Sequence, residues 1–451
     1  MGEDRISSAN ILSLVFDFAE DARPAYYLYK GKPPEGAFGR FFGDFRSVPE
    51  SGAGGLSPKN SLLVAVDDGL EVPSKFLKKE SKNVLLLSEE NAHRIGFESE
   101  GWHTKEYLVF SPRKDILFVS PDEVMLPHFL GMLQAASETQ FGGIAASMAG
   151  KFPRTPLPKH MFKKMFLFSP EKMGTYSNEI RDRYGCDGIC FRCGHNLKTN
   201  YFCFRGKKMA KILSTATVEE NSDKVLNVEC LGKKLEGIPF EIAKIRSREF
   251  VAADCIPARR WKPAMNEASL SLFSSHLRKV QREFQCGKQE YWEPEELEKY
   301  LLSFPGREYF EDIYPSKELV RRFIGHLSSN GLRVPDMIEH GDATAPNILY
   351  SQERGDIILM DWEKCNTHGE PFCDLFSFIS TLPKGADNIT KAAASSSVAE
   401  YFGGMGMGPD ILLKYLPIGF YRRMWSTSIT KSQIKRKRRR FESFLGIAGI
   451  Y

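Results

Sequence analysis

The sequence lacks the features that mark membrane-spanning, secreted and nucleic-acid-binding proteins. No apolar run in its 451 residues approaches the roughly 18 that a membrane-spanning helix needs. The apolar residues 11–16 are followed at once by Asp17, Glu20 and Asp21, so we predict no secretory signal. The net charge of +5 is mild and does not by itself indicate a nucleic-acid partner. We therefore expect a cytoplasmic protein.

Cysteine is sparse and odd in number. Nine cysteines in so long a chain fit reduced thiols better than a disulfide scaffold. Cys186, Cys190 and Cys193 have the spacing of an iron–sulfur cluster loop, and His195 would instead complete a zinc site. Cys190 and Cys193 lie in a strand-like run, however, where their side chains would point to opposite faces. We interpret these cysteines as buried thiols and keep a cysteine-ligated metal enzyme as an alternative.

The N-terminal third has glycine-rich stretches but no dinucleotide-binding fingerprint after a strand. Its apolar, strand-like runs predict a smaller α/β domain of unknown role in residues 1–155. A helix is predicted at residues 126–148, and a basic, proline-containing linker at residues 151–159. The strand-like runs are residues 25–29, 61–66, 83–87, 106–110 and 116–119.

A later segment places oxygen-bearing side chains at a turn and a hairpin. Asp342 and Asn347 lie five residues apart, and Pro346 between them excludes a helix interior. Residues 347–350 and 357–360 are apolar, and the polar stretch between them predicts a hairpin of two strands.

Such a hairpin would return Asp361 to the neighbourhood of Asp342 and Asn347. Magnesium prefers oxygen ligands, and a carboxylate can orient or deprotonate a hydroxyl group. The three side chains therefore predict a site for a magnesium-dependent reaction at a hydroxyl.

These residues resemble a known catalytic core. His340-Gly-Asp342, the later Asn347 and the strand-borne Asp361-Trp-Glu363 look like the core of the aminoglycoside phosphotransferase and choline kinase family. These are small-molecule kinases with a protein-kinase-like fold. The resemblance implies that Asp342 is the catalytic base, that Asn347 and Asp361 hold Mg²⁺, and that Asp374 anchors the loop behind the site.

The same resemblance implies nucleotide-binding residues upstream. Gly194 opens a candidate phosphate loop, and Lys211 lies between apolar neighbours on a predicted strand, from which it would reach the phosphates of ATP. Glu229 lies on a predicted amphipathic helix at residues 223–235 and would pair with Lys211. Residues 249–257 would then lead as a strand into a hinge.

The expected fold is α+β, a protein-kinase-like bilobal phosphotransferase domain preceded by the smaller α/β domain. Residues 156–257 would form the nucleotide-binding lobe. Residues 258–451 would form a helical lobe with the catalytic loop, because residues 264–284, 294–304 and 316–330 have helical spacing.

The implied activity is transfer of the γ-phosphate of Mg-ATP to a hydroxyl of a small molecule or glycan. No acidic cluster commits the acceptor to an amine. A kinase-like binding or scaffold protein without catalysis is the second alternative. The basic run at residues 431–440 is either a solvated helix end or a contact for an anionic surface.

Overall fold

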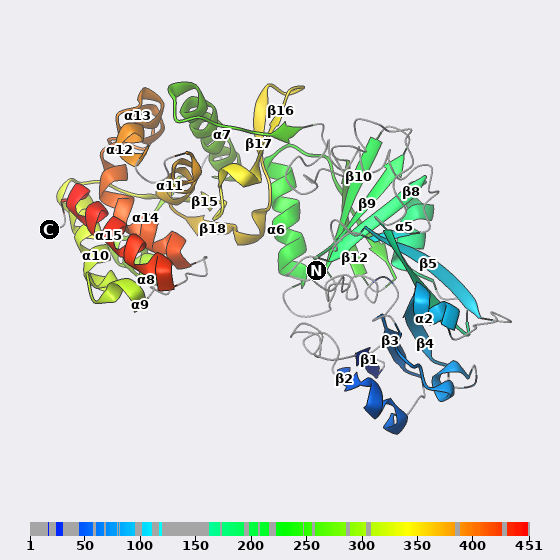
Figure 1. Cartoon of the computed structure of the whole chain (residues 1–451). Coiled ribbons are helices and arrows are strands. Elements are labelled where there is room, and N and C mark those ends of the chain that lie inside the picture. The colour runs from blue at the N-terminus through cyan, green and yellow to red at the C-terminus, as the bar shows by residue number, and fades with distance from the viewer. Residues whose placement is uncertain are drawn as a thin grey trace. The chain divides into compact units, whose positions relative to one another are not determined.

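The computed structural model has the α+β composition that the sequence predicts (Figure 1). It divides into two compact units, one of residues 1–230 and 239–256, the other of residues 231–238 and 257–451. None of the helices in the described residues is long and apolar enough to cross a bilayer. The structure describes residues 17, 24–29, 45–56, 60–66, 69–78, 80, 82–94, 102–110, 117–119, 162–171, 174–193, 198–205, 208–215, 222–246, 248–254, 258–285, 289–303, 308–383, 388–425 and 431–449.

The first unit is built on one continuous sheet, whose described strands number twelve. From one edge to the other their order is β11-β12-β10-β9-β8-β6-β5-β7-β4-β3-β1-β2. The strands are β1 (Ala25–Tyr29), β2 (Phe45–Pro49), β3 (Leu62–Ala65), β4 (Val84–Ser88), β5 (His103–Phe110), β6 (Leu117–Val119), β7 (Phe162–Ser169), β8 (Gly188–Cys193), β9 (Lys198–Arg205), β10 (Lys208–Thr215), β11 (Glu241–Ile245) and β12 (Arg248–Asp254).

The strands β2, β1, β3 and β4 pair in parallel, and all later pairings in the sheet are antiparallel. Both faces of β1, β3 and β4 are buried. Tyr27 and Val64 pack into one apolar cluster, whereas their neighbours Leu28 and Leu63 pack into the other. Strands buried on both faces read as near-continuous apolar runs, which is why the sequence pattern found them.

The C-terminal half of this sheet confirms the predicted strands at residues 188–193, 201–204 and 209–213. The helix predicted at residues 223–235 is α6 (Ser222–Leu235). The predicted helix at residues 126–148 and the predicted linker at residues 151–159 lie outside the described residues.

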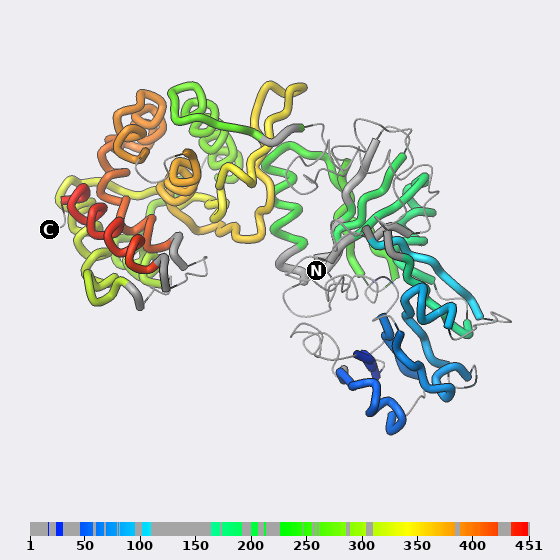
Figure 2. The backbone as a smooth tube through the Cα atoms, in the orientation of Figure 1, coloured from blue at the N-terminus to red at the C-terminus, as the bar shows by residue number. Residues whose placement is uncertain are grey.

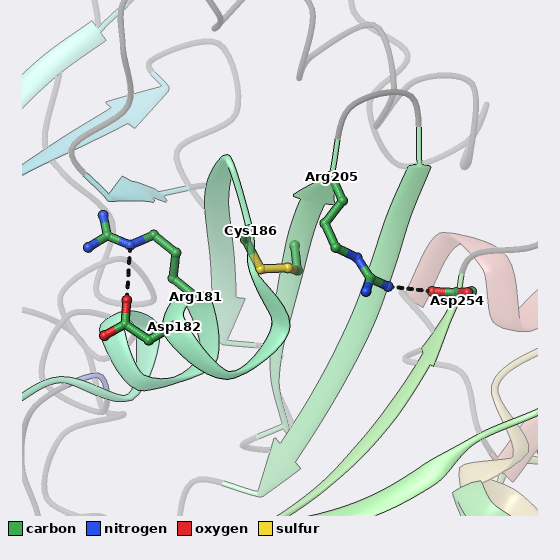
Figure 3. The surroundings of a disulfide bond; sticks show 6 residues. Arg181, Asp182, Cys186, Arg205 and Asp254 are labelled. Carbon is green, nitrogen blue, oxygen red and sulfur yellow. Dashed lines mark hydrogen bonds and ion pairs between the residues drawn. A yellow bond between two sulfur atoms is a disulfide. The ribbon is translucent and has the colours of Figure 1, made fainter.

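Cys186 is not a free thiol. It follows α5 (Tyr176–Tyr184), and it forms a disulfide with Cys203 of β9, with the two Cα atoms 5.5 Å apart (Figure 3). The prediction of ordinary buried thiols is therefore wrong for Cys186, because the fold brings it against a later strand. The bond also removes Cys186 from the three-cysteine metal site, while Cys190 is buried, as predicted, and forms no disulfide in the described part of the chain.

The second unit is mostly helical (Figure 1). The helices predicted at residues 264–284, 294–304 and 316–330 are confirmed as α7, α8 and α10. The described helices are α7 (Glu267–Gln285), α8 (Pro294–Ser303), α9 (Glu308–Glu311), α10 (Ser316–Ser329), α11 (Phe372–Thr381), α12 (Ile389–Ala393), α13 (Ser396–Gly403), α14 (Ile411–Trp425) and α15 (Lys431–Ile447).

Two small sheets flank the loop and hairpin that contain Asp342, Asn347 and Asp361. One pairs β13 (Arg259–Arg260) with the hairpin of β16 (Ile348–Ser351) and β17 (Asp356–Leu359), which is yellow in Figure 2. The other sheet contains β14 (Glu290–Tyr291), β15 (Pro335–Glu339) and β18 (Asn366–Gly369). The hairpin that the sequence predicted is thus confirmed.

A buried histidine fixes the position of this hairpin. The Nε2 atom of His276, on α7, lies 3.1 Å from a Glu236 oxygen, and its Nδ1 atom lies 3.2 Å from Asp356 at the start of β17. Glu236 also accepts the Leu359 backbone N–H at 3.0 Å. Burial acts to lower the pKa of His276, but the bonds to Asp356 and Glu236 outweigh it and raise that pKa to about 9.

This network predicts a specific pH dependence of stability. Because the folded-state pKa of His276 is raised from 6.5 to about 9, its stabilisation is complete below pH 6.5 and is lost as the pH rises through 9. The urea midpoints of wild type and His276→Gln, compared at pH 6.5 and 9.5, should differ most at pH 6.5. The lost stabilisation is on the order of 2–3 kcal/mol. A gap between the two proteins that stays constant with pH would contradict a charged His276.

Candidate active site

One buried carboxylate holds the loop that follows β15. Asp374, in the first turn of α11, is 1% exposed and accepts the backbone N–H groups of His340 at 2.6 Å and Gly341 at 3.0 Å. Burial and the nearby Glu339 raise the pKa of Asp374, and the two N–H bonds favour its ionised form against that. The predicted anchoring position of Asp374 is confirmed.

His340 connects this loop to the hairpin. Burial lowers the pKa of His340 to about 4, so its ring is neutral at pH 7. The Nδ1 atom accepts the Asp342 backbone N–H at 3.2 Å, and the Nε2 atom therefore carries the proton that it donates to the Met360 carbonyl at 3.0 Å. The ring thereby fixes Asp342 relative to the end of β17.

Gly341 is required by its surroundings as well as by its backbone. Its φ is +76°, in the left-handed region that glycine favours. A Cβ atom at this position would lie 2.3 Å from the Lys364 carbonyl oxygen. The loop from His340 to Asp342 therefore packs directly against the backbone of the segment that follows Asp361.

A matched pair of substitutions separates these two requirements. Gly355, in the hairpin turn, has a φ of +63° but open space around a Cβ atom, so Gly355→Ala should cost only the left-handed penalty of about 1–2 kcal/mol. Gly341→Ala should cost a further 1–3 kcal/mol or so, because the carbonyl of Lys364 must also move. Urea unfolding of both variants measures the difference. Equal losses would show that the close contact at Gly341 is not significant.

The predicted catalytic residue and one predicted magnesium ligand share a hydrogen bond. The Asp342 backbone carbonyl accepts the Asn347 side-chain N–H at 3.0 Å. This orientation leaves the Oδ1 atom of Asn347 as the side-chain atom able to ligate a cation. The half-buried Asp342 carboxylate accepts a bond from Lys364 at 2.9 Å. Asp342 is thus both accessible and oriented by a cation.

Asp361 lies at the end of the hairpin, beside the same loop. The Met360 N–H donates to the Asn347 carbonyl at 2.8 Å, so Asp361 follows directly on a residue bonded to Asn347. Its φ of 67° and ψ of 63° are left-handed, which is uncommon for a residue other than glycine and is often found at functional positions. Its side chain is exposed.

The donor atoms of Asn347 and Asp361 are of the type that a magnesium ion prefers. Asn347 offers an amide oxygen and Asp361 a carboxylate, and both are hard oxygen donors of the kind that Mg²⁺ selects. Another group of potential metal ligands among the described residues, Glu339, Glu370 and Cys373, is buried. Arg422 donates to both of its carboxylates, so this group already holds a cation.

The Arg422 cluster lies behind the loop and is buried throughout. Arg422 is 5% exposed and contacts Glu339, the last residue of β15, at 2.9 Å. It also bonds to Glu370, which accepts the Tyr415 hydroxyl at 2.6 Å. Tyr300 donates to the second oxygen of Glu339 at 2.9 Å. The two carboxylates therefore share one guanidinium and accept further hydrogen bonds from tyrosine hydroxyls, and this buried cluster holds the end of β15 in place.

Removing this arginine should be far more harmful than removing one from the surface. Arg422→Met leaves two buried carboxylates without their cation, which should cost about 3–5 kcal/mol of unfolding free energy. Arg438→Met, which breaks a bidentate but exposed pair with Asp312 at 2.8 Å, should cost less than about 1 kcal/mol. Denaturant unfolding of both variants tests this. A mild effect at Arg422 would mean that the cluster is hydrated.

The predicted nucleotide-binding residues are placed only in part. Lys211 lies in β10, between Phe202 of β9 and Ala253 of β12. Glu229 lies on α6 and is 9% exposed. The side chain of Lys211 and the whole of Gly194 lie outside the described residues. The pairing of Lys211 with Glu229 stays a prediction.

Sequence reasoning missed Lys364 and Arg422. Lys364 lies three residues after Asp361, so its position in the same short segment is a usable signal. Arg422 gives a weaker signal, a basic residue in a largely apolar helix, and nothing in the sequence names its partners.

The basic run at residues 431–440 begins the helix α15. Arg438 pairs with Asp312, whereas Lys435, Arg436 and Arg439 are exposed. Contact of this run with an anionic surface stays a prediction.

No protein-family model and no curated protein matches the chain. Solved structures do match. A choline kinase from Streptococcus pneumoniae is 15% identical, with a TM-score of 0.37, and the match covers 61% of this chain and 99% of that protein. A microcompartment-associated aminopropanol kinase is 13% identical, with a TM-score of 0.38, over 61% of this chain and 97% of the other.

A spectinomycin phosphotransferase, solved with ADP and spectinomycin, is 14% identical, with a TM-score of 0.33, over 60% of this chain and 96% of that protein. Values this low do not assign a function by themselves. All three matches are to small-molecule kinases, and all three have TM-scores below 0.5.

Proposed function

We propose that this protein is an ATP-dependent phosphotransferase that moves the γ-phosphate of Mg-ATP to a hydroxyl of a small molecule or glycan. The observation that supports the proposal is that hydrogen bonds link the chain segments that contain Asp342, Asn347 and Asp361. Asn347 bonds to the carbonyl of Asp342, and its own carbonyl bonds to the residue before Asp361. Oxygen donors for a metal and an accessible carboxylate are what phosphoryl transfer to a hydroxyl requires.

Each residue has a distinct role in this proposal. Asp342 orients the acceptor hydroxyl and takes its proton as the oxygen attacks phosphorus. Lys364, 2.9 Å from Asp342, keeps that carboxylate in place before the acceptor binds. Asn347 and Asp361 hold Mg²⁺, which when bound neutralises charge on the phosphates. The neutral ring of His340 holds the backbone of Asp342 and does not itself exchange protons near pH 7.

The nucleotide-binding part of the proposal rests on sequence. Lys211 would neutralise the phosphates of ATP, Glu229 would orient Lys211, and the loop at Gly194 would cover the phosphates. Domain limits at residues 155 and 257 and a cytoplasmic location belong to the same proposal. The disulfide of Cys186 is the kind of bond that oxidising compartments favour, so the thiol state of the protein in cells is a useful check on location.

The alternatives make different demands. A scaffold without catalysis has no need of both an accessible Asp342 and a strained, exposed Asp361. The cysteine-ligated metal enzyme would need Cys186 as a thiolate, and in this structure it is bonded to Cys203.

The decisive experiment is transfer of labelled γ-phosphate from Mg-ATP to a metabolite extract and to a panel that includes choline, aminopropanol and spectinomycin. Asp342→Asn should lower turnover by roughly 10²–10⁴-fold while leaving ATP binding intact. Asp361→Asn should abolish the magnesium dependence of ATP binding. Asp312→Asn, a carboxylate paired at the surface with Arg438, is the control and should behave as wild type.

Two results would count against the proposal. If turnover survives the Asp342→Asn substitution, Asp342 is not the catalytic base. If the wild-type protein binds no nucleotide, the scaffold alternative is favoured. The transfer assay measures the first result, and calorimetric titration with Mg-ATP measures the second.

A further inference from the structure

A cavity in the first unit lies outside the proposed phosphotransfer residues. It is partly open to solvent and has a volume of about 570 Å³, within the range of small-molecule sites. One wall is formed by the start of β5 and the end of β7, and the other by α5. These elements come earlier in the chain than β10 and α6, which carry the predicted nucleotide-binding residues Lys211 and Glu229.

Polar side chains of α5 line one wall in register. Thr175, Asn178 and Arg181 are spaced three residues apart, so they lie on the same face of the helix and line the cavity together. The Asn178 side-chain oxygen accepts a bond from Lys105 at 3.2 Å. Its amide nitrogen therefore keeps two N–H donors for another partner. This wall supplies hydrogen-bond donors and positive charge.

Lys105 forms the floor of the cavity. Its side chain is 15% exposed, and its Nζ atom lies 2.9 Å from the Ser177 hydroxyl and 3.5 Å from Asp17. Burial lowers the pKa of Lys105, Asp17 opposes that shift, and the positive charges of Arg181 and Arg246 add to the lowering. The floor thus places the positive charges of Lys105 and Arg181 near each other.

The nearby carboxylates are already engaged. Asp17 accepts the Ser177 backbone N–H at 2.7 Å and the Tyr107 hydroxyl at 3.2 Å, in addition to its contact with Lys105. Glu106, which also lines the cavity, pairs with Lys164 at 3.0 Å. Arg181 makes only a long, exposed contact of 3.8 Å with its neighbour Asp182 in the described structure (Figure 3). Arg181 therefore has capacity for a further anion.

We propose that this cavity binds a small metabolite through a phosphate or carboxylate group, held by Arg181 and Asn178, with the positive charge of Lys105 nearby. A single oxyanion would fill only a small part of the volume, so the group belongs to a larger molecule. The ring of Phe166 provides an apolar surface for the remainder. The site is separate from the phosphotransfer reaction and does not depend on it.

Calorimetric titration of the full chain without magnesium tests this, with glucose 6-phosphate and citrate as probes and glucose as the neutral control. We expect saturable binding of one molecule of at least one anionic probe, and none of glucose. The probe that binds distinguishes a phosphate from a carboxylate ligand. Arg181→Gln should weaken binding at least tenfold. Lys105 is left unchanged because its buried bonds also support the fold.

Arg183→Gln is the matched control, because Arg183 lies on the same helix but faces Tyr184 and Glu241. It should change affinity less than twofold. Equal weakening by both substitutions would show a general charge effect and overturn the proposal. So would the absence of binding to wild type, or competition by ATP, which would place the anion in the nucleotide site.

Discussion

The geometry of the candidate site depends on the carboxylate of Asp374. It accepts two successive backbone N–H groups, those of His340 and Gly341, and so determines where the chain goes after β15. Buried N–H groups must find acceptors, and a loop that turns away from its sheet has few backbone acceptors available. A side-chain carboxylate from another helix supplies them. With that turn set, His340 reaches Met360, and Asp342 faces the segment beyond the hairpin.

Around this loop, the charged groups that hold the structure in place are buried, and the carboxylates proposed to take part in the reaction are accessible. His276 lies between two carboxylates beneath the hairpin, and Arg422 lies between two others beneath the end of β15. Asp342 and Asp361, by contrast, are accessible. Buried ion pairs hold their neighbours in fixed positions when they are hydrogen-bonded, and each of these four carboxylates contacts a cation. The result is a rigid base carrying two accessible carboxylates, which suits a reaction in which positioning provides most of the catalysis.

The sequence predicted what depends on local pattern. The hairpin followed from two apolar runs around a polar turn, and the anchoring position of Asp374 followed from a resemblance in the order of motifs. Pairings between distant segments were not predictable. Neither the insertion of β7 between β4 and β5 nor the bond from Cys186 to Cys203 has a local signal, because each depends on how the whole sheet is ordered. The partners of Arg422 come from two separate segments, and spacing along the chain does not reveal them.

The order of strands in the large sheet has a consequence for synthesis on the ribosome. Every residue of β4 is buried. Its partner on one side is β7, which is synthesised after β5 and β6. Until β7 emerges, β4 and β5 each have one edge without its native partner, and in the native sheet these two edges do not pair with each other. Exposed strand edges of this kind recruit other chains and favour aggregation. We therefore expect the segment from β4 to β6 to be most prone to aggregation during synthesis before β7 emerges.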